Sequence, residues 1–134
     1  MIKFQEIKVG DYLIADNDGD QLKGEVTNLN WDEQQVCVNT GTQDFWFETE
    51  QLKAILLTED EMMNLKFSKE VQDDGAIKFS KGAFRMLIPG NADFSKAEIW
   101  YRDERRHITH QMNVHELQNH FYEMTKVHLN DEAF

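Results

Sequence analysis

The fold is decided by the stretch VGDYLIADNDGDQLKGEVTNLN, residues 9–30. An Asp-Gly pair at Asp18 and Gly19 divides it, and such a pair readily takes the positive φ angles of a tight hairpin turn. Residues 22–29 alternate in the way that a half-buried strand requires. One face of that strand would carry Leu22, Gly24, Val26 and Asn28. The stretch therefore predicts an antiparallel β-hairpin.

Short strands separated by turn residues continue beyond this hairpin. Residues 35–39 and 44–48 have the composition of strands, and another is expected at 54–56. Their regular spacing predicts a small antiparallel barrel. Together with Val9-Gly10-Asp11-Tyr12, the Gly-Glu-Val and Phe-Trp-Phe-Glu strands resemble SH3-like barrels of the KOW and Tudor kind. We therefore expect residues 1–56 to form an SH3-like barrel.

The second part of the chain, residues 57–134, has the pattern of an α+β segment. Thr58 and Glu61 form a capping box that predicts a short helix, and Asn113 and Glu116 predict the start of a terminal amphipathic helix. Between the helices, turn residues separate strands that are expected at 76–79, 84–88, 97–102 and 105–112. The predicted class is mainly β or α+β, with the two parts forming one compact unit.

The chain is strongly acidic. It has 14 Lys and Arg against 25 Asp and Glu, a formal net charge of −11. A general binder of the phosphate backbone needs a basic stripe, so direct nucleic-acid binding is not expected. In the simplest interpretation the acidic residues keep the protein soluble. In the alternative they mimic nucleic acid and occupy a basic partner, with phosphate-like spacing of Asp16, Asp18, Asp20, Asp32 and Glu33.

The cysteine content and the hydropathy of the sequence limit the cellular compartments that are expected for this protein. The single cysteine, Cys37, excludes a disulfide framework and a cysteine-based zinc site. The sequence has neither the apolar run of a signal peptide nor 18 successive apolar residues. We expect a cytoplasmic protein with no membrane association.

Two segments resemble a known family. Residues 51–67 are similar to a segment in which a Pro-Leu-Thr-Glu helix ends in Gly-Phe, and residues 114–125 are similar to the signature Val-His-x-Leu-Gln-Asn-x-Tyr/Phe. Both are typical of a family of small uncharacterised proteins of Bacteroidota and their prophages. Lys66 stands where a Gly is common, and Lys126-Val127 replaces a Thr-Gly-acidic ending, so the last helix is expected to end differently or run a turn longer. The resemblance implies a bacterial, prophage-related setting and no established activity.

The terminal helix carries the first candidate site. His115, Gln118, Asn119 and Tyr122 recur at intervals of three and four residues and so share a face beside the apolar one. These side chains both donate and accept hydrogen bonds, which suits binding of a peptide backbone or a base edge. Alternatively they anchor the helix internally. An enzyme would need a pocket here with a second titratable group, and no motif supplies one, so catalysis is not expected.

Aromatic residues in the first part form the second candidate. Trp46 alternates with Phe45 and Phe47 on its strand, and Tyr12 and Trp31 would complete a groove for an extended peptide. Packing in the core is the alternative use of these rings. Trp31 precedes a turn and is the tryptophan expected to be most exposed.

Other patterns give no site. The five histidines have no metal-binding spacing, with His107 and His110 expected on opposite faces of a strand. The alternating aspartates do not match an EF-hand. The basic cluster at 102–107 contains two acids and has the pattern of a solvated hairpin tip. We expect a non-catalytic protein- or peptide-binding module without cofactor or metal, whose partner is another protein.

Overall fold

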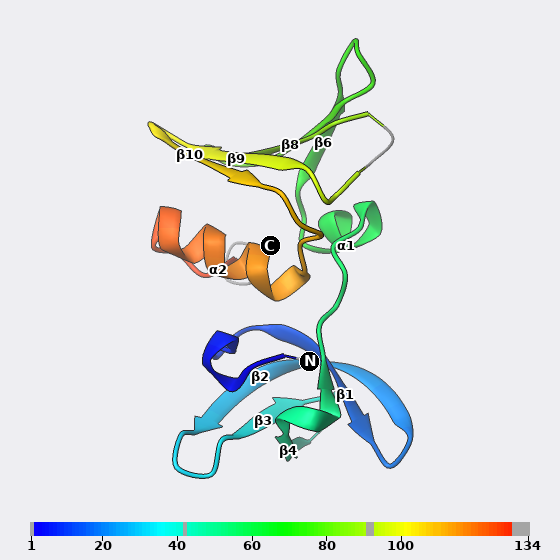
Figure 1. Cartoon of the computed structure of the whole chain (residues 1–134), viewed down its shortest axis with the longest axis vertical. Helices are drawn as coiled ribbons and strands as arrows, with labels where there is room; N and C mark the ends of the chain where they lie inside the picture. The colour runs from blue at the N-terminus through cyan, green and yellow to red at the C-terminus, as the bar shows by residue number, and fades with distance from the viewer. Residues whose placement is uncertain (1, 42, 91–92, 130–134) are drawn as a thin grey trace. The chain divides into compact units, whose positions relative to one another are not determined.

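The computed structural model describes residues 2–41, 43–90 and 93–129. The chain forms two compact units, residues 1–55 and 56–134, and each is built on a five-stranded antiparallel sheet (Figure 1). The predicted class, mainly β with an α+β second part, is confirmed. No helix among the described residues is long and apolar enough to cross a membrane.

The first unit is a meander whose last strand returns to its first. The strand order is β4-β3-β2-β1-β5, so β4 and β5 are the two edge strands of the sheet. Its elements are η1 (Phe4–Glu6), β1 (Tyr12–Asn17), β2 (Asp20–Asn30), β3 (Gln35–Asn39), β4 (Asp44–Glu48), η2 (Thr49–Gln51) and β5 (Leu52–Lys53). The final strand is shorter and earlier than the predicted 54–56, because pairing with β1 begins as soon as η2 ends and places Leu52 in the core.

The β1–β2 hairpin forms as the Asp-Gly pair predicts. Asn17 pairs with Asp20, and the two residues between them, Asp18 and Gly19, have φ angles of 52° and 92°. A carboxylate oxygen of Asp16 accepts the Gly19 N–H at 2.9 Å. Both turn residues thus take the left-handed conformations of a type I′ turn, whose twist matches that of the strands.

The alternation predicted for β2 holds only at its centre. Gly24 and Val26 are buried, as expected, but Leu22 is exposed near the hairpin end. The register shifts between Val26 and Asn28, which leaves Asn28 exposed. Such a bulge adds a residue to one strand and interrupts the period of two.

The core of this unit lies on one face of the sheet. Side chains from all five strands meet the apolar residues of the N-terminal segment there, and the buried cluster consists of Ile2, Phe4, Ile7, Leu13, Ala15, Val26, Val36, Val38, Phe47 and Leu52. Gly24 faces this core, and a Cβ added to it would lie 2.6 Å from both the Asn39 carbonyl oxygen and Val38 Cγ1. A glycine is required here because the next strand approaches closely.

We predict that Gly24→Ala lowers the free energy of unfolding by about 1–3 kcal/mol, the usual cost of overpacking. Gly90→Ala is the matched control, because the nearest atom to an added Cβ there is 3.8 Å away. Urea titration followed by circular dichroism measures both. Equal stability of the two variants would contradict the close approach.

The second unit is also a meander, with strand order β10-β9-β8-β7-β6. Its elements are α1 (Glu59–Asn64), β6 (Ser68–Val71), β7 (Ile77–Lys81), β8 (Phe84–Ile88), β9 (Ala97–Tyr101), β10 (Glu104–Ile108) and α2 (Val114–Thr125). The sequence did not predict β6, because all four of its residues are exposed and show no apolar alternation. The strand β10 ends at Ile108 rather than at 112, so His110 lies beyond it.

Helix α2 covers one face of this sheet (Figure 1) and contributes Val114, Leu117, Phe121 and Met124 to the core. The rings of Phe84 on β8 and Phe121 on α2 lie 4.9 Å apart. Both predicted caps are present: Thr58 Oγ1 accepts the Glu61 N–H at 3.2 Å, and Asn113 heads a capping box at α2. The apolar residues predicted for the helices, including Met62, Leu65, Leu117 and Met124, are buried.

Lys66 and Lys126 stand at the two positions where glycine is common in the family that the sequence resembles. Both residues adopt a left-handed backbone conformation in this chain. Lys126, the C-cap of α2, has φ 65°, and Lys66 has φ 68°. The last helix therefore ends at Thr125 with the geometry that a glycine would favour, and it does not run a turn longer.

We predict that Lys126→Gly raises the free energy of unfolding by about 1 kcal/mol, because glycine carries no steric penalty at positive φ. Lys126→Ala is the control, since it removes the same charge and keeps the Cβ. Chemical denaturation of both compares them directly. A glycine variant no more stable than the alanine variant would show that the αL conformation costs nothing here.

Candidate functional site

The predicted polar face of α2 runs from the core to the surface. His115 and Gln118 are buried, with 2% and 5% of their surface exposed, while Asn119 is half-buried and Tyr122 is exposed. The Tyr122 ring stacks on His128 at 4.4 Å. The structure therefore does not present the four side chains together to solvent. Only Asn119 and Tyr122 are accessible to a partner.

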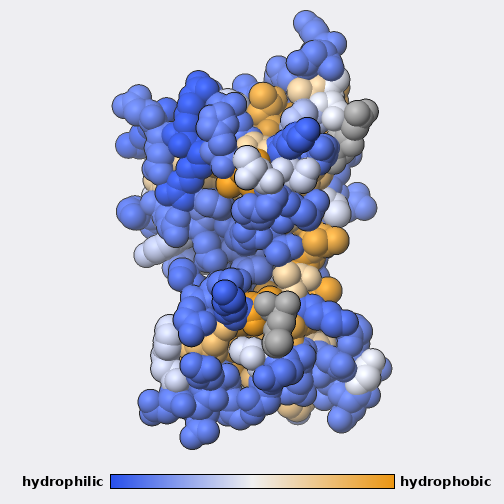
Figure 2. Space-filling model, viewed as in Figure 1, coloured by the Kyte–Doolittle hydropathy of each residue, from blue (hydrophilic) through white to orange (hydrophobic). Residues whose placement is uncertain are grey.

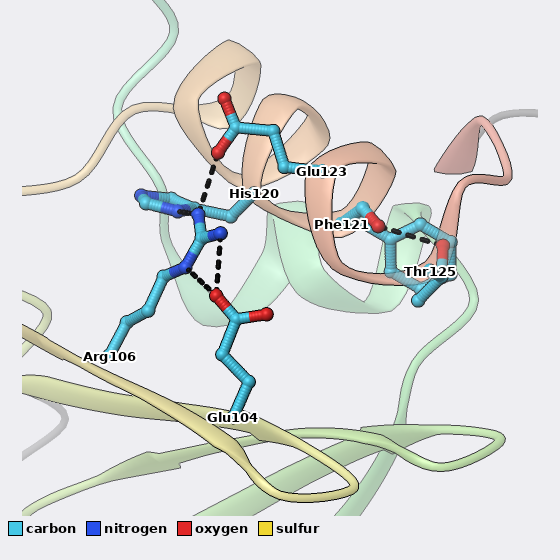
Figure 3. Close-up of polar contacts among 6 residues, drawn as sticks. All are labelled: Glu104, Arg106, His120, Phe121, Glu123 and Thr125. Atoms are coloured by element: carbon cyan, nitrogen blue, oxygen red, sulfur yellow. Dashed lines mark hydrogen bonds and ion pairs between the residues drawn. The ribbon is translucent and has the colours of Figure 1, made fainter.

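A polar cluster joins α2 to the edge strand β10 (Figure 3). Arg106 Nη1 lies 2.6 Å from Glu123 Oε1 and 2.8 Å from His120 Nδ1. Its Nε donates to Glu104 Oε2 at 2.9 Å. Because a guanidinium only donates, His120 Nδ1 must accept, which requires the neutral imidazole with its proton on Nε2.

The environment of His120 favours that neutral form. Burial of the ring lowers the pKa of His120 below its ordinary value, and the Arg106 guanidinium lowers it further. The carboxylates of Glu123 and Glu116 act in the opposite direction with smaller effect. The unfolded chain therefore binds a proton at His120 that the folded chain excludes, and stability falls as the pH drops from about 6.5 toward the folded-state pKa.

We predict that His120→Gln reduces this pH dependence, because the amide does not titrate. The measurement is the free energy of unfolding of parent and variant at closely spaced pH values between about 5 and 7. The parent should lose more stability than the variant as the pH falls through this window. Identical slopes would contradict the assignment of the effect to His120.

Two exposed aromatic side chains of the first unit lie on one edge strand of its sheet. Strand β4 pairs with β3 on one side and ends the sheet order. Phe45 and Trp46 on this strand are 40% and 47% exposed, while Phe47 is buried in the core. We refer to Asp44, Phe45, Trp46 and Glu48 as the β4 edge.

The other two aromatic residues of the predicted groove lie elsewhere on the unit. Trp31 is 63% exposed and packs edge-on against Phe4 with ring centres 4.8 Å apart. Its exposure is as predicted. By register, Tyr12 and Trp46 both point away from the core, but two strands separate β1 from β4. Only Trp46, of the three predicted residues, belongs to the β4 edge.

The β4 edge keeps its negative charge. Asp44 Oδ1 accepts from the Asn39 amide at 2.9 Å, and Glu48 Oε1 accepts from the Gln35 amide at 2.9 Å. Both amide partners are neutral, so they orient the carboxylates without neutralising their negative charge. The unit as a whole has 4 basic and 11 acidic residues in positions 1–55.

The five acids proposed as phosphate mimics fall into two groups. Asp16, Asp18 and Asp20 surround the β1–β2 turn, whereas Asp32 and Glu33 follow the far end of β2. Strand β2, which begins at Asp20 and ends at Asn30, runs between the groups. Figure 2 shows hydrophilic residues over most of the visible face of both units, with apolar residues exposed in small patches among them.

The open face of the second sheet carries a row that sequence reasoning missed. Arg85, Trp100 and Arg105 are direct neighbours across three strands, and the two guanidinium carbons lie 5.9 and 5.8 Å from the Trp100 ring centre. Cation–π contacts of this kind contribute about 0.5–1 kcal/mol at exposed sites. Only the strand register brings these distant residues together, so no local motif could have shown them.

Within the described residues, no group of three or more His, Cys, Asp and Glu side chains has the geometry to hold a metal ion. His110 lies in the loop before α2 and pairs with Glu116 at 2.8 Å. Comparison of the chain with protein-family models, with curated proteins and with solved structures finds no match.

Proposed function

We propose that this protein is a non-catalytic binding module whose first unit adds an extended, basic segment of another protein to its β4 edge. The exposure of Phe45 and Trp46 on an edge strand carries the proposal. An edge strand offers unpaired N–H and C=O groups, and proteins usually protect such edges with charge, proline or a covering segment. Large apolar side chains on an edge favour a partner strand.

The partner's chemistry follows from the flanking charges. Asp44 and Glu48 begin and end the strand, and their hydrogen bonds come from neutral amides. A paired strand places its side chains opposite those of β4 at about 4.5–5.5 Å. A segment that alternates basic and apolar residues therefore complements both the carboxylates and the aromatic rings.

We further infer that this binding takes place in a bacterial cytoplasm, in a prophage-related setting. The resemblance to the Bacteroidota family and the buried free thiol of Cys37 support this setting.

The test uses an acetylated and amidated octapeptide of alternating Lys and Val, titrated by calorimetry and by amide chemical shifts. We predict binding to the parent and a tenfold or greater loss with Trp46→Ala, because a central aromatic anchor contributes about 2 kcal/mol or more. Trp31→Ala is the matched control, since it removes the same side chain from a turn of the same unit. It should bind like the parent.

Two further peptides separate strand pairing from simple charge attraction. A version methylated on alternate backbone nitrogens keeps its charge and cannot pair as a strand, so its binding should be lost. A Glu–Val version should also fail. Equal binding of the methylated peptide, or equal loss in the two tryptophan variants, would overturn the proposal.

A further inference from the structure

A hollow of about 410 Å³ opens at one end of the second sheet, where β7 and β9 begin and β8 and β10 end. We refer to it as the sheet-end hollow. Its apolar lining includes Leu87, Ala97 and Ile108, and its polar lining includes Lys96, Glu98 and His107. Its volume lies in the range of about 300–1,000 Å³ that small-molecule sites occupy, and such sites are mostly apolar with a few polar groups.

The acidic groups of the hollow are already engaged by the protein. Glu98 Oε1 lies 2.6 Å from Arg105 Nη1, and Asp74 Oδ1 accepts the Ala76 N–H at 3.0 Å. A charged Arg neutralises the first carboxylate, and a backbone amide orients the second. Neither is therefore well placed to recognise a cationic ligand.

The two basic groups of the hollow, Lys96 and His107, are not engaged in this way by the described part of the protein. Within the described ranges, the side chains of Lys96 and His107 take part in no hydrogen bond or ion pair, although Asp93 attracts Lys96 at longer range. The Asp93 carboxylate itself accepts from the Ser95 N–H at 3.0 Å. Lys96 Nζ has three donors and no acceptor, and an imidazole offers at least one further N–H. These are the donors that a carboxylate requires.

We propose that the sheet-end hollow binds a small amphipathic carboxylate. The apolar body of the ligand would lie against Leu87, Ala97 and Ile108, and its carboxylate would accept hydrogen bonds from Lys96 Nζ and the His107 ring. Charge-assisted hydrogen bonds of this type are stronger than neutral ones. The inference is independent of the β4 edge, because every lining residue belongs to the second unit.

Three probes with the same alkyl chain test the charge preference: octanoate, octanol and octylammonium. Titration into ¹⁵N-labelled protein should move the amide signals of residues 96–98 and 107–109 with octanoate. Octanol should bind at least tenfold more weakly, and octylammonium should leave these signals unchanged. All additions stay below the critical micelle concentration of each probe.

Two variants in the hollow and one control variant outside it test where the probe binds. Lys96→Glu should weaken octanoate binding at least tenfold, and Lys53→Glu, which changes the net charge equally on β5 of the first unit, should not. Leu87→Asp should also weaken binding by setting a charge against the alkyl chain. Thermal unfolding verifies that each variant is folded. Equal affinity for the three probes, equal losses in the two lysine variants, or signal changes confined to other residues would overturn the proposal.

Discussion

The pleat of an antiparallel sheet constrains this whole molecule, because alternate side chains point to opposite faces and each unit covers only one of them. In the first unit the N-terminal residues Ile2 and Phe4 complete the covered face, and in the second unit α2 does so. Most side chains on the opposite face of each sheet are half-buried or exposed, although Cys37 on β3 is buried. The candidate sites therefore arise on edges and sheet ends, where strands expose either backbone or mixed side chains.

In the second unit, apolar contacts hold α2 against the sheet, and polar contacts orient the helix. The Phe84–Phe121 pair lies inside the core, while Arg106 reaches from β10 to His120 and Glu123 at its margin. Burying a charged group is costly unless it is paired. Arg106 keeps about a quarter of its side-chain surface exposed and has two carboxylate partners, so the cluster fixes the helix without a large desolvation cost.

The sequence predicted turns and helix caps, which depend on neighbouring residues, but it did not predict the register between distant strands. The Asp18-Gly19 turn and the Thr58 and Asn113 caps depend on neighbours within four residues, and all three form as predicted. Strand β6 has no buried residue, so its sequence shows no apolar alternation from which a strand could be predicted. The burial of His115 and the exposure of Trp46 depend on which face meets the core. The Arg85–Trp100–Arg105 row needs three strands in register, which spacing alone does not specify.

The net charge of −11 governs the molecule at long range, but recognition at short range follows the nearest side chains. At physiological ionic strength the field of an exposed charge decays over about 8 Å, a distance shorter than either unit. The net negative charge therefore disfavours binding of a polyanion that must contact many positions of the surface at once. It does not prevent one carboxylate from binding beside Lys96, whose acidic neighbours Glu98 and Asp93 already have donors. The same screening is consistent with the proposed selection of a basic strand by the uncompensated Asp44 and Glu48, so the two proposed surfaces of opposite preference are compatible in one acidic chain.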